Sequence, residues 1–354
     1  MRDYAAMTTL VVERLQSSGT ADYSVNEVNN GLTQALQEYS GYHPHLAGLT
    51  FNLESRFGTD VTASASSLTD SVKKQFVAAD ATDEKVIHNT SRNTRAVVLT
   101  VSSSTVITLG MNLMTANDNY SIYNKQCWNS RQVYVGDVPN YESIHSVEYP
   151  IGTRRNWKRY DKVLEIDLDY VPDSNANTAI VTYPNDVTAL VRFIQPHVLP
   201  NLTDFAGNVA ATVAVGATSI SSSAWQSAGT INLGTEFTIE NHRQTYIVAG
   251  SATIASNTVA ISLYPPLEAA VSSTAWVITI RQSSLEPDAE DMIADLAAAR
   301  IALNKAPLFL RSIGAMGQAT VNNFITYGER RLAEVRGRLE ASAPPKTSRR
   351  YPTD

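Results

Sequence analysis

Two stretches of this 354-residue chain share one order of short apolar runs, and that shared order constrains the fold more than any other feature. Both stretches, 58–124 and 206–281, are poor in charge and rich in Ser, Thr, Ala and Val. The pattern predicts two small β-barrel or β-sandwich modules inserted into one host fold; chance similarity among short β-rich runs is the alternative. The runs are 85–89, 96–101, 105–109 and 120–122 in the first stretch, and 236–241, 245–248, 258–263 and 276–278 in the second.

The N-terminal region has a helical pattern. Ser24 and Glu27 have the spacing of a capping box, which predicts a helix start. Apolar residues then recur at helical spacing as far as Gly41, where the helix is expected to end. A shorter helix is expected around 10–15.

The C-terminal region is also helical. Pro287 suits the first turn of a helix, and acidic residues follow it at the positive end of the helix dipole. We expect a break at Pro307 and a last helix from about 318 to 340. The apolar face of that helix includes Leu332, Val335 and Leu339.

The region between the two modules has strand patterns. Residues 163–170 alternate apolar and acidic side chains, which is typical of a strand with one solvated face. Further strands are expected at 133–135, 179–183 and 190–194.

These patterns predict an α+β fold. The N- and C-terminal helices form a helical bundle, and a central antiparallel β-region carries the two inserted modules. The expected divisions are 1–57 (N-terminal helices), 58–124 (first module), 125–205 (central β-region), 206–281 (second module), 282–341 (C-terminal helices) and 342–354 (an extended arm).

Composition limits the class of protein. Hydrophobic residues make up 43% and charged residues 18%, which excludes wholesale disorder. The net charge of -6 argues against a protein that grips nucleic acid over its whole surface. The single cysteine, Cys127, forms no internal disulfide, and no apolar run or signal-peptide pattern indicates a membrane or secretion. We therefore expect the chain to be made in a cytoplasm.

The residue types that usually carry catalysis form no convincing constellation. His43 and His45 lack a third metal ligand, and we interpret them as part of a helix-ending loop. Asp167 and Asp169 share one strand face, where they could hold a cation or serve acid–base chemistry, but Glu165 continues the same row, and we favour the solvated face of a half-buried strand as the explanation for all three. Phosphate loops, nucleophile elbows and zinc spacings are absent from the sequence. We expect no enzyme activity, no cofactor and no metal.

One basic cluster stands out against the acidic whole. It could contact nucleic-acid phosphate or an acidic neighbouring subunit, and we favour the subunit contact. Its basic members are Arg154, Arg155, Lys158, Arg159 and Lys162, with Trp157 and Tyr160 interleaved.

The helical ends resemble the head-to-tail adaptor (connector, or neck) proteins of tailed bacteriophages. The segment Val-Asn-Asn-Gly-Leu-Thr-Gln-Ala-Leu-Gln-Glu-Tyr-Ser (28–40) resembles their opening helix. Segments 149–157 and 191–199 are similar to the middle of those proteins, and the final helices resemble theirs. The resemblance covers about half of the chain and leaves the two modules outside it.

The resemblance implies a structural protein of the virion neck. Such adaptors form a ring, usually a dodecamer, beneath the portal protein, and they bind the next tail or nozzle component below. Double-stranded DNA passes through the ring without sequence-specific binding. Leu332, Val335 and Leu339 are expected to contact neighbouring subunits. Another tail or baseplate component is the first alternative. A glycan-binding module that uses Trp225 and Trp276 is the second.

The last residues form a peptide that cannot build a core. Prolines and basic residues predict an extended arm, and we expect it to bind the portal through a few charged and stiff apolar contacts. The candidate residues are Pro344, Pro345, Lys346, Arg349, Arg350 and Tyr351.

Overall fold

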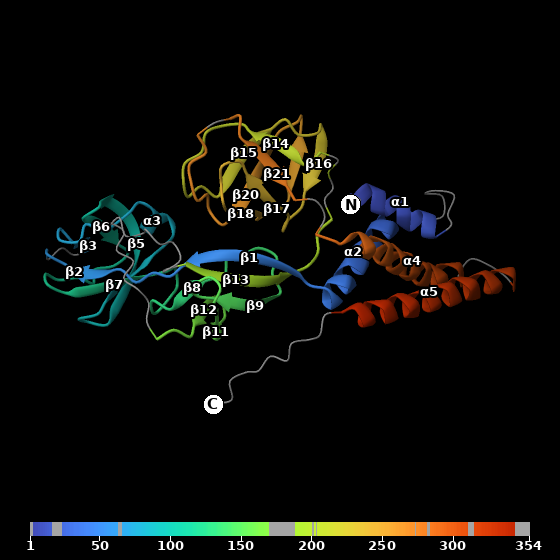
Figure 1. Cartoon of the computed structure of the whole chain (residues 1–354), viewed down its shortest axis with the longest axis horizontal. Helices are drawn as coiled ribbons and strands as arrows, with labels where there is room; N and C mark the ends of the chain where they lie inside the picture. The colour runs from blue at the N-terminus through green and yellow to red at the C-terminus, as the bar shows by residue number, and fades with distance from the viewer. Residues whose placement is uncertain are drawn as a thin grey trace, which may run out of the picture. The chain divides into compact units, whose positions relative to one another are not determined.

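The computed structural model describes residues 3–15, 23–62, 66–169, 188–199, 202, 204–272, 274–281, 284–310 and 315–343. The fold is mixed α+β, as the sequence predicts, and it is mostly β (Figure 1). It divides into two compact units, each described by itself below. Unit 1 comprises Met1–Leu46, Pro139–Glu142 and Ile194–Asp354, and unit 2 comprises Ala47–Val138 and Ser143–Phe193.

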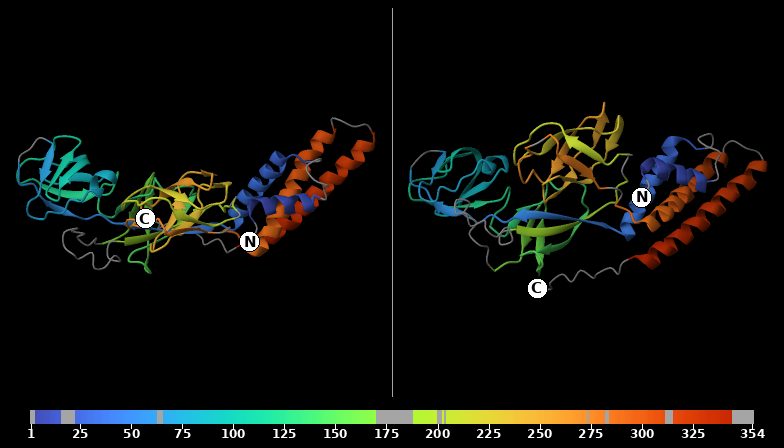
Figure 2. Two further views of the ribbon diagram at one scale, coloured as in Figure 1. Left: turned by 90° about the horizontal axis from the view of Figure 1, so that it is seen from above. Right: turned by 45° about the horizontal axis from the view of Figure 1, so that its top comes forward.

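Four helices of unit 1 share one hydrophobic core. They are α1 (Tyr4–Arg14), α2 (Val25–Tyr42), α4 (Pro287–Leu310) and α5 (Ala315–Ser342), and α4 runs alongside α5 (Figure 2). The capping box is confirmed, because Ser24 Oγ accepts from the Glu27 N–H and the Glu27 carboxylate accepts from the Ser24 N–H at 2.8 Å. Glu38 of α2 forms ion pairs with Arg300 of α4 and Arg336 of α5. Segments from both ends of the sequence therefore form one helical core.

The break predicted at Pro307 falls slightly later, since α4 ends at Leu310 and α5 begins at Ala315. Helix α4 continues to Leu310, three residues beyond the proline. A proline removes one N–H and crowds one carbonyl of the preceding turn. Since this proline lies in the last turn, the disruption is confined to the end of the helix.

Unit 2 contains the central β-region. One sheet has the order β1 (His45–Asn52), β13 (Thr188–Gln195), β9 (Ser143–Glu148) and β10 (Arg154–Arg155). A second has the order β11 (Trp157–Tyr160), β12 (Val163–Ile166) and β8 (Gln132–Tyr134). The strand expected at 163–170 is shorter than predicted, and the one expected at 179–183 lies outside the described residues.

Each unit also contains one six-stranded β-module. Module A, in unit 2, is an open sheet and includes the short helix α3 (Ala79–Thr82). Module B, in unit 1, is a closed barrel with an additional pair, β16 (Ala228–Ile231) and β19 (Ala252–Ala255). The strands of module A are β2 (Phe57–Thr59), β3 (Ser67–Thr69), β4 (Val86–Asn89), β5 (Thr94–Ser103), β6 (Val106–Leu109) and β7 (Asn119–Tyr123). Those of module B are β14 (Ala206–Val209), β15 (Ser219–Ser223), β17 (Glu236–Ile239), β18 (Thr245–Val248), β20 (Val259–Tyr264) and β21 (Val277–Ile280).

The two modules have the same topology. Read from the first strand, the neighbour order is β2-β7-β4-β5-β6-β3 in module A and β14-β21-β17-β18-β20-β15 in module B. When the six strands of each module are numbered along the chain, strands with the same number occupy the same position in both sheets. In module B the pairing of β14 with β15 closes the barrel. In module A the corresponding segments, which follow β2 and form β3, are joined by a hydrogen bond in which the Val61 N–H donates to the Thr69 carbonyl at 2.9 Å.

The register of the strands also agrees. Leu68 pairs with Ile107 as Ile220 pairs with Ile261, and Gly58 pairs with Tyr120 as Gly207 pairs with Ile278. Hydrogen bonds outside the ladders correspond as well. The donor–acceptor pairs are Val98–Lys85 and Val248–Thr235, Thr90–Asn119 and Glu240–Val277, Ile122–Arg56 and Ile280–Phe205, and Leu109–Ser66 and Leu263–Thr218. The shared order of runs in the sequence thus corresponds to a shared three-dimensional pattern.

A glycine makes room for a buried polar pair in both modules. In module B the indole Nε1 of Trp225 donates to Ser222 Oγ at 2.8 Å, and a Cβ at Gly207 would lie 2.2 Å from the indole ring. At the corresponding place in module A, the Tyr120 hydroxyl donates to Asp70 at 2.6 Å, and a Cβ at Gly58 would lie 2.3 Å from that carboxylate.

Candidate functional site

The predicted basic cluster lies on two short consecutive strands of unit 2. Arg154 and Arg155 form β10, and Lys158 and Arg159 lie in β11; all four side chains are exposed. Trp157, on the same strand as Lys158, is half-buried, and Tyr160 at its end is exposed. Strand β11 is at the edge of its sheet, so its outer backbone groups are not paired with another described strand. The arrangement suits an acidic protein surface or a phosphate backbone.

The predicted subunit contacts on the last helix require a correction. Val335 and Leu339 are fully buried in the helical core of the chain itself, and Leu332 packs against that core while partly exposed. Their apolar periodicity reflects the contact of α5 with the other helices. Buried side chains of this kind are unavailable to a second subunit.

The predicted portal-binding arm, from Pro344 to Tyr351, lies outside the described residues.

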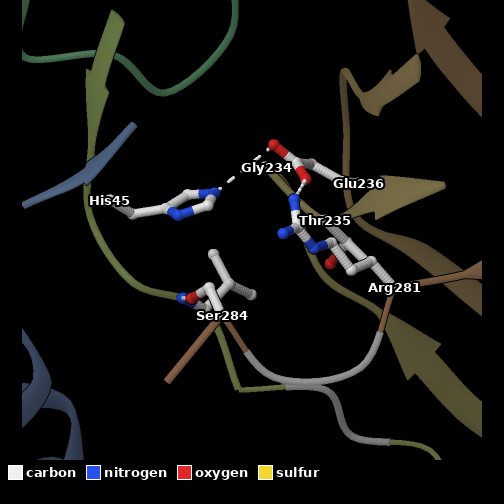
Figure 3. Close-up of a pocket in the computed structure, with 7 residues that line it drawn as sticks. His45, Gly234, Thr235, Glu236, Arg281 and Ser284 are labelled. Carbon is white, nitrogen blue, oxygen red and sulfur yellow. Dashed lines mark hydrogen bonds and ion pairs between the residues drawn. The ribbon is translucent and has the colours of Figure 1, made fainter. Parts of the chain in front are cut away.

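A small pocket in unit 1 joins the start of β1 to module B (Figure 3). His45 Nε2 lies 3.3 Å from Glu236 Oε1, and Arg281 forms an ion pair with the other oxygen of the same carboxylate. Burial of Glu236 raises the pKa of its carboxyl, but hydrogen bonds to His45 and Arg281 outweigh burial and hold that pKa below the usual range. Ser284 and Val198 line the opposite side.

His197 lies next to this pocket, with its ring 5.6 Å from that of His45. Its Nε2 is 2.7 Å from the His43 carbonyl, and its Nδ1 is 2.9 Å from Ser284 Oγ. Burial lowers the pKa of His197 to about 4. A neutral ring that donates through Nε2 and accepts at Nδ1 satisfies both contacts.

The size of the pocket decides its role. Its volume is about 20 Å³, which is enough for about one water molecule, whereas ligand pockets are of the order of hundreds of Å³. The group His45, Glu236 and Arg281 is therefore a structural connection between module B and the start of β1. No sequence pattern indicates this group, because its members are far apart in the chain.

The other residues considered for chemistry lie in different surroundings. His43 caps the end of α2 and stacks on Tyr39. Cys127 is buried, and burial raises the pKa of its thiol to about 12. Asp167 and Asp169 are exposed, as expected for a solvated face. Trp225 is buried in module B and Trp276 packs against the same core, which leaves neither as an open sugar-stacking platform.

Sequence reasoning missed an exposed row on module A. Val97 and Leu99 point outward from β5, and Met111 and Trp128 are exposed nearby. In the run from Arg95 to Leu99, apolar residues occupy consecutive positions and therefore lie on both faces of the strand. An apolar residue on the expected wet face was the signal that could have revealed this row.

Comparison of the chain with family models, curated proteins and solved structures finds no match. Within the described residues, no helix is long and apolar enough to cross a membrane.

Proposed function

We propose that this chain is a non-enzymatic structural protein of a tailed-phage virion, the head-to-tail adaptor of the neck. One observation supports the proposal most. The segments that resemble adaptors are distant in sequence, yet α2, α4, α5 and Leu199 belong to one hydrophobic core. The two β-modules are inserted between the helices in the sequence, and α2, α4 and α5 nevertheless share one core.

In this proposal the four helices form the predicted bundle, and the chains assemble as a dodecameric ring beneath the portal. Double-stranded DNA passes through the ring, and the next tail or nozzle component binds below. The exposed strands β10 and β11 supply cations for an acidic surface of the neighbouring subunit.

Ring formation on the portal tests this proposal. The purified chain is mixed with the portal protein of the same phage, and the complex is examined by electron microscopy and by mass measurement. We expect a ring of adaptor density coaxial with the portal. A chain that remains monomeric and never binds the portal would contradict the proposal, and a ring that binds only a tail or baseplate component would assign the protein to the tail.

The terminal arm gives a second test. Truncation after Ala343 keeps α5 intact, including Ser342, whose hydroxyl lies 3.1 Å from His43 Nε2. We expect the truncated chain to fold normally and to lose stable portal binding. The double substitution Arg349→Glu and Arg350→Glu should weaken binding, and most strongly at low salt. Undiminished binding by the truncated chain would remove the arm from the proposal.

A further inference from the structure

Three connecting segments of unit 1 meet at one side chain, the imidazole of His197. Its Nε2 lies 2.7 Å from the His43 carbonyl, and its Nδ1 lies 2.9 Å from Ser284 Oγ. His43 belongs to the segment between α2 and β1, His197 to the one between β13 and module B, and Ser284 to the one between module B and α4. The His197 N–H also donates to Ser40 Oγ of α2 at 2.9 Å. One residue therefore contacts every segment at this place, which we call the His197 junction.

The His197 junction is followed by two separate hydrophobic cores. Leu199, two residues beyond His197, belongs to the core of the helices, whereas Leu202 belongs to the core of module B. The Leu199 carbonyl accepts from Asn232 Nδ2 of module B at 3.0 Å. Because each part has its own core, module B and the helices can separate without either one unfolding.

Module B also reaches the His197 junction through a charged contact. The carboxylate of Glu236 binds His45, and the ring of His45 lies 5.6 Å from that of His197. Ser284, which binds the His197 ring, lines the same small pocket as Glu236 (Figure 3). The His197 ring therefore adjoins the contact that joins module B to the start of β1.

The hydrogen bonds of the His197 ring suit its neutral form. Ser284 Oγ accepts the Val198 N–H at 3.2 Å, so the hydroxyl hydrogen can be donated to His197 Nδ1. The Nε2 then carries the ring hydrogen and donates to the His43 carbonyl. A second proton, on Nδ1, would face the hydroxyl hydrogen of Ser284. Protonation of the ring therefore weakens its contact with the segment that precedes α4.

The groups that face the ring also oppose a positive charge. They are Tyr39 and His43 at the end of α2 and His45 at the start of β1. Burial, and after it the charges of the two neighbouring imidazoles, lowers the pKa of His197 to about 4, although its hydrogen bonds raise it. No described carboxylate forms an ion pair with His197, so a proton on the ring would be poorly compensated. The other charged groups nearby are Glu236 and Arg281 of module B, which bind each other, and Glu286, which acts on Tyr39.

We propose that the His197 junction is acid-sensitive: protonation of His197 releases the connecting segments, and module B separates from the helices of unit 1 while both stay folded. The proposal is independent of a role in a virion neck, because it concerns contacts within one chain. The closed form binds the neutral ring, so it is favoured above the ordinary histidine pKa of 6.5 and is lost as the pH falls towards 4. At pH 5 the opening equilibrium should be about fivefold larger than at pH 7.

Energy transfer between two dyes on the full chain tests the proposal. Val215 of module B and Glu329 of α5 are both exposed, and each is replaced by a labelled cysteine in a Cys127→Ala background. From pH 7 to pH 4.5 we expect the transfer efficiency to fall. The circular dichroism of the helices and the fluorescence of the buried Trp225 should remain those of the folded chain.

Two substitutions identify the group that responds. His197→Asn keeps a donor and an acceptor but does not titrate in this range, so its transfer efficiency should stay constant. His88→Asn, in module A, is the matched control and should respond as the wild type does.

Hydrogen exchange of the wild type gives a measurement that needs no substitution. The amides of His197 and Val198, which donate to Ser40 and Ser284, should exchange about fivefold faster at pH 5 than at pH 7 after correction for intrinsic pH dependence. A constant transfer efficiency in the wild type would overturn the proposal. So would an unchanged response in His197→Asn, or a response that coincides with loss of the helical signal.

Discussion

Modules A and B have the same strand order and register but different surroundings. Their inward positions are apolar and buried in both, such as Leu68 and Ile107 in module A and Ile220 and Ile261 in module B. Their outward positions differ, because Ile247 is buried against its own chain while Val97 is exposed. The comparison teaches that the inward residues specify the module, and that the outward residues vary with the surroundings of each module.

A second difference lies at one end of the modules. Arg56 of module A corresponds to Phe205 of module B, since their carbonyls accept the N–H groups of Ile122 and Ile280. Arg56 is buried and forms ion pairs with Glu54 and Asp80. Phe205 packs against the apolar core of module B. The same position in the shared fold can therefore hold a buried ion cluster or an apolar side chain.

The largest expected effect comes from introducing the same charge at corresponding outward positions. Ile247→Asp buries a carboxylate without a partner and should destabilise unit 1 by more than about 4 kcal/mol. Val97→Asp places the carboxylate in solvent and should change stability by less than about 1 kcal/mol. Hydrogen exchange reports the two units separately. Equal losses of stability in the two units would contradict the difference between these two outward positions.

The next effect concerns the buried ions of module A. Arg56→Met leaves Glu54 and Asp80 without their shared cation and should destabilise unit 2 by about 3 kcal/mol or more. Phe205→Met replaces one apolar side chain with another and should destabilise unit 1 by about 1 kcal/mol. Urea denaturation followed by hydrogen exchange measures both. If the two variants are equally stable, the ion cluster is dispensable and the distinction disappears.

The glycines should behave alike, because they serve the same purpose in the two modules. Gly58→Ala and Gly207→Ala each force a Cβ into the buried polar pair and should destabilise their own unit by about 2 kcal/mol. Gly110→Ala is the control, since the nearest atom to its Cβ would be 3.7 Å away. A neutral Gly207→Ala together with a harmful Gly58→Ala would show that the modules differ here too.

Mild acid should lower the stability of unit 1 before it affects unit 2, and this effect should be smaller than the preceding ones. The folded pKa of His197 is about 4, below its ordinary value of 6.5, so between these values the unfolded chain binds a proton that the folded chain does not. The stability of unit 1 should therefore fall from pH 6.5 towards pH 4, by about 1 kcal/mol at pH 5 after allowing for solvent screening of the ring.

Unit 2 should respond at lower pH. Lys85 and Arg56 lower the pKa of Glu54 to about 2 despite burial. Its contribution to stability is present above pH 4.5 and is lost as the pH falls towards 2. Exchange rates corrected for intrinsic pH dependence measure both units, and His197→Asn should remove the early loss from unit 1. If unit 1 of the His197→Asn variant still loses stability in mild acid, a group other than His197 causes that loss.

Much of the fold could be predicted from local sequence. The runs 236–241 and 245–248 correspond to β17 and β18, and Ser24 with Glu27 begins α2 as expected. These features depend on side-chain alternation and on contacts between residues close in the chain. The functional surfaces were harder to predict, because exposure of Val97 or burial of Ile247 depends on segments far from either residue.

The sequence by itself determined the elements: which runs form strands, where α2 begins, and that one module pattern occurs twice. The tertiary structure alone decided which surfaces those elements leave open. It buried Val335 and Leu339 in the helical core and connected His45 to Glu236 across 191 positions, and it left Leu99 exposed. The physical reason is that periodicity records which face of an element is apolar, whereas burial depends on whichever other segment, or other chain, packs against that face.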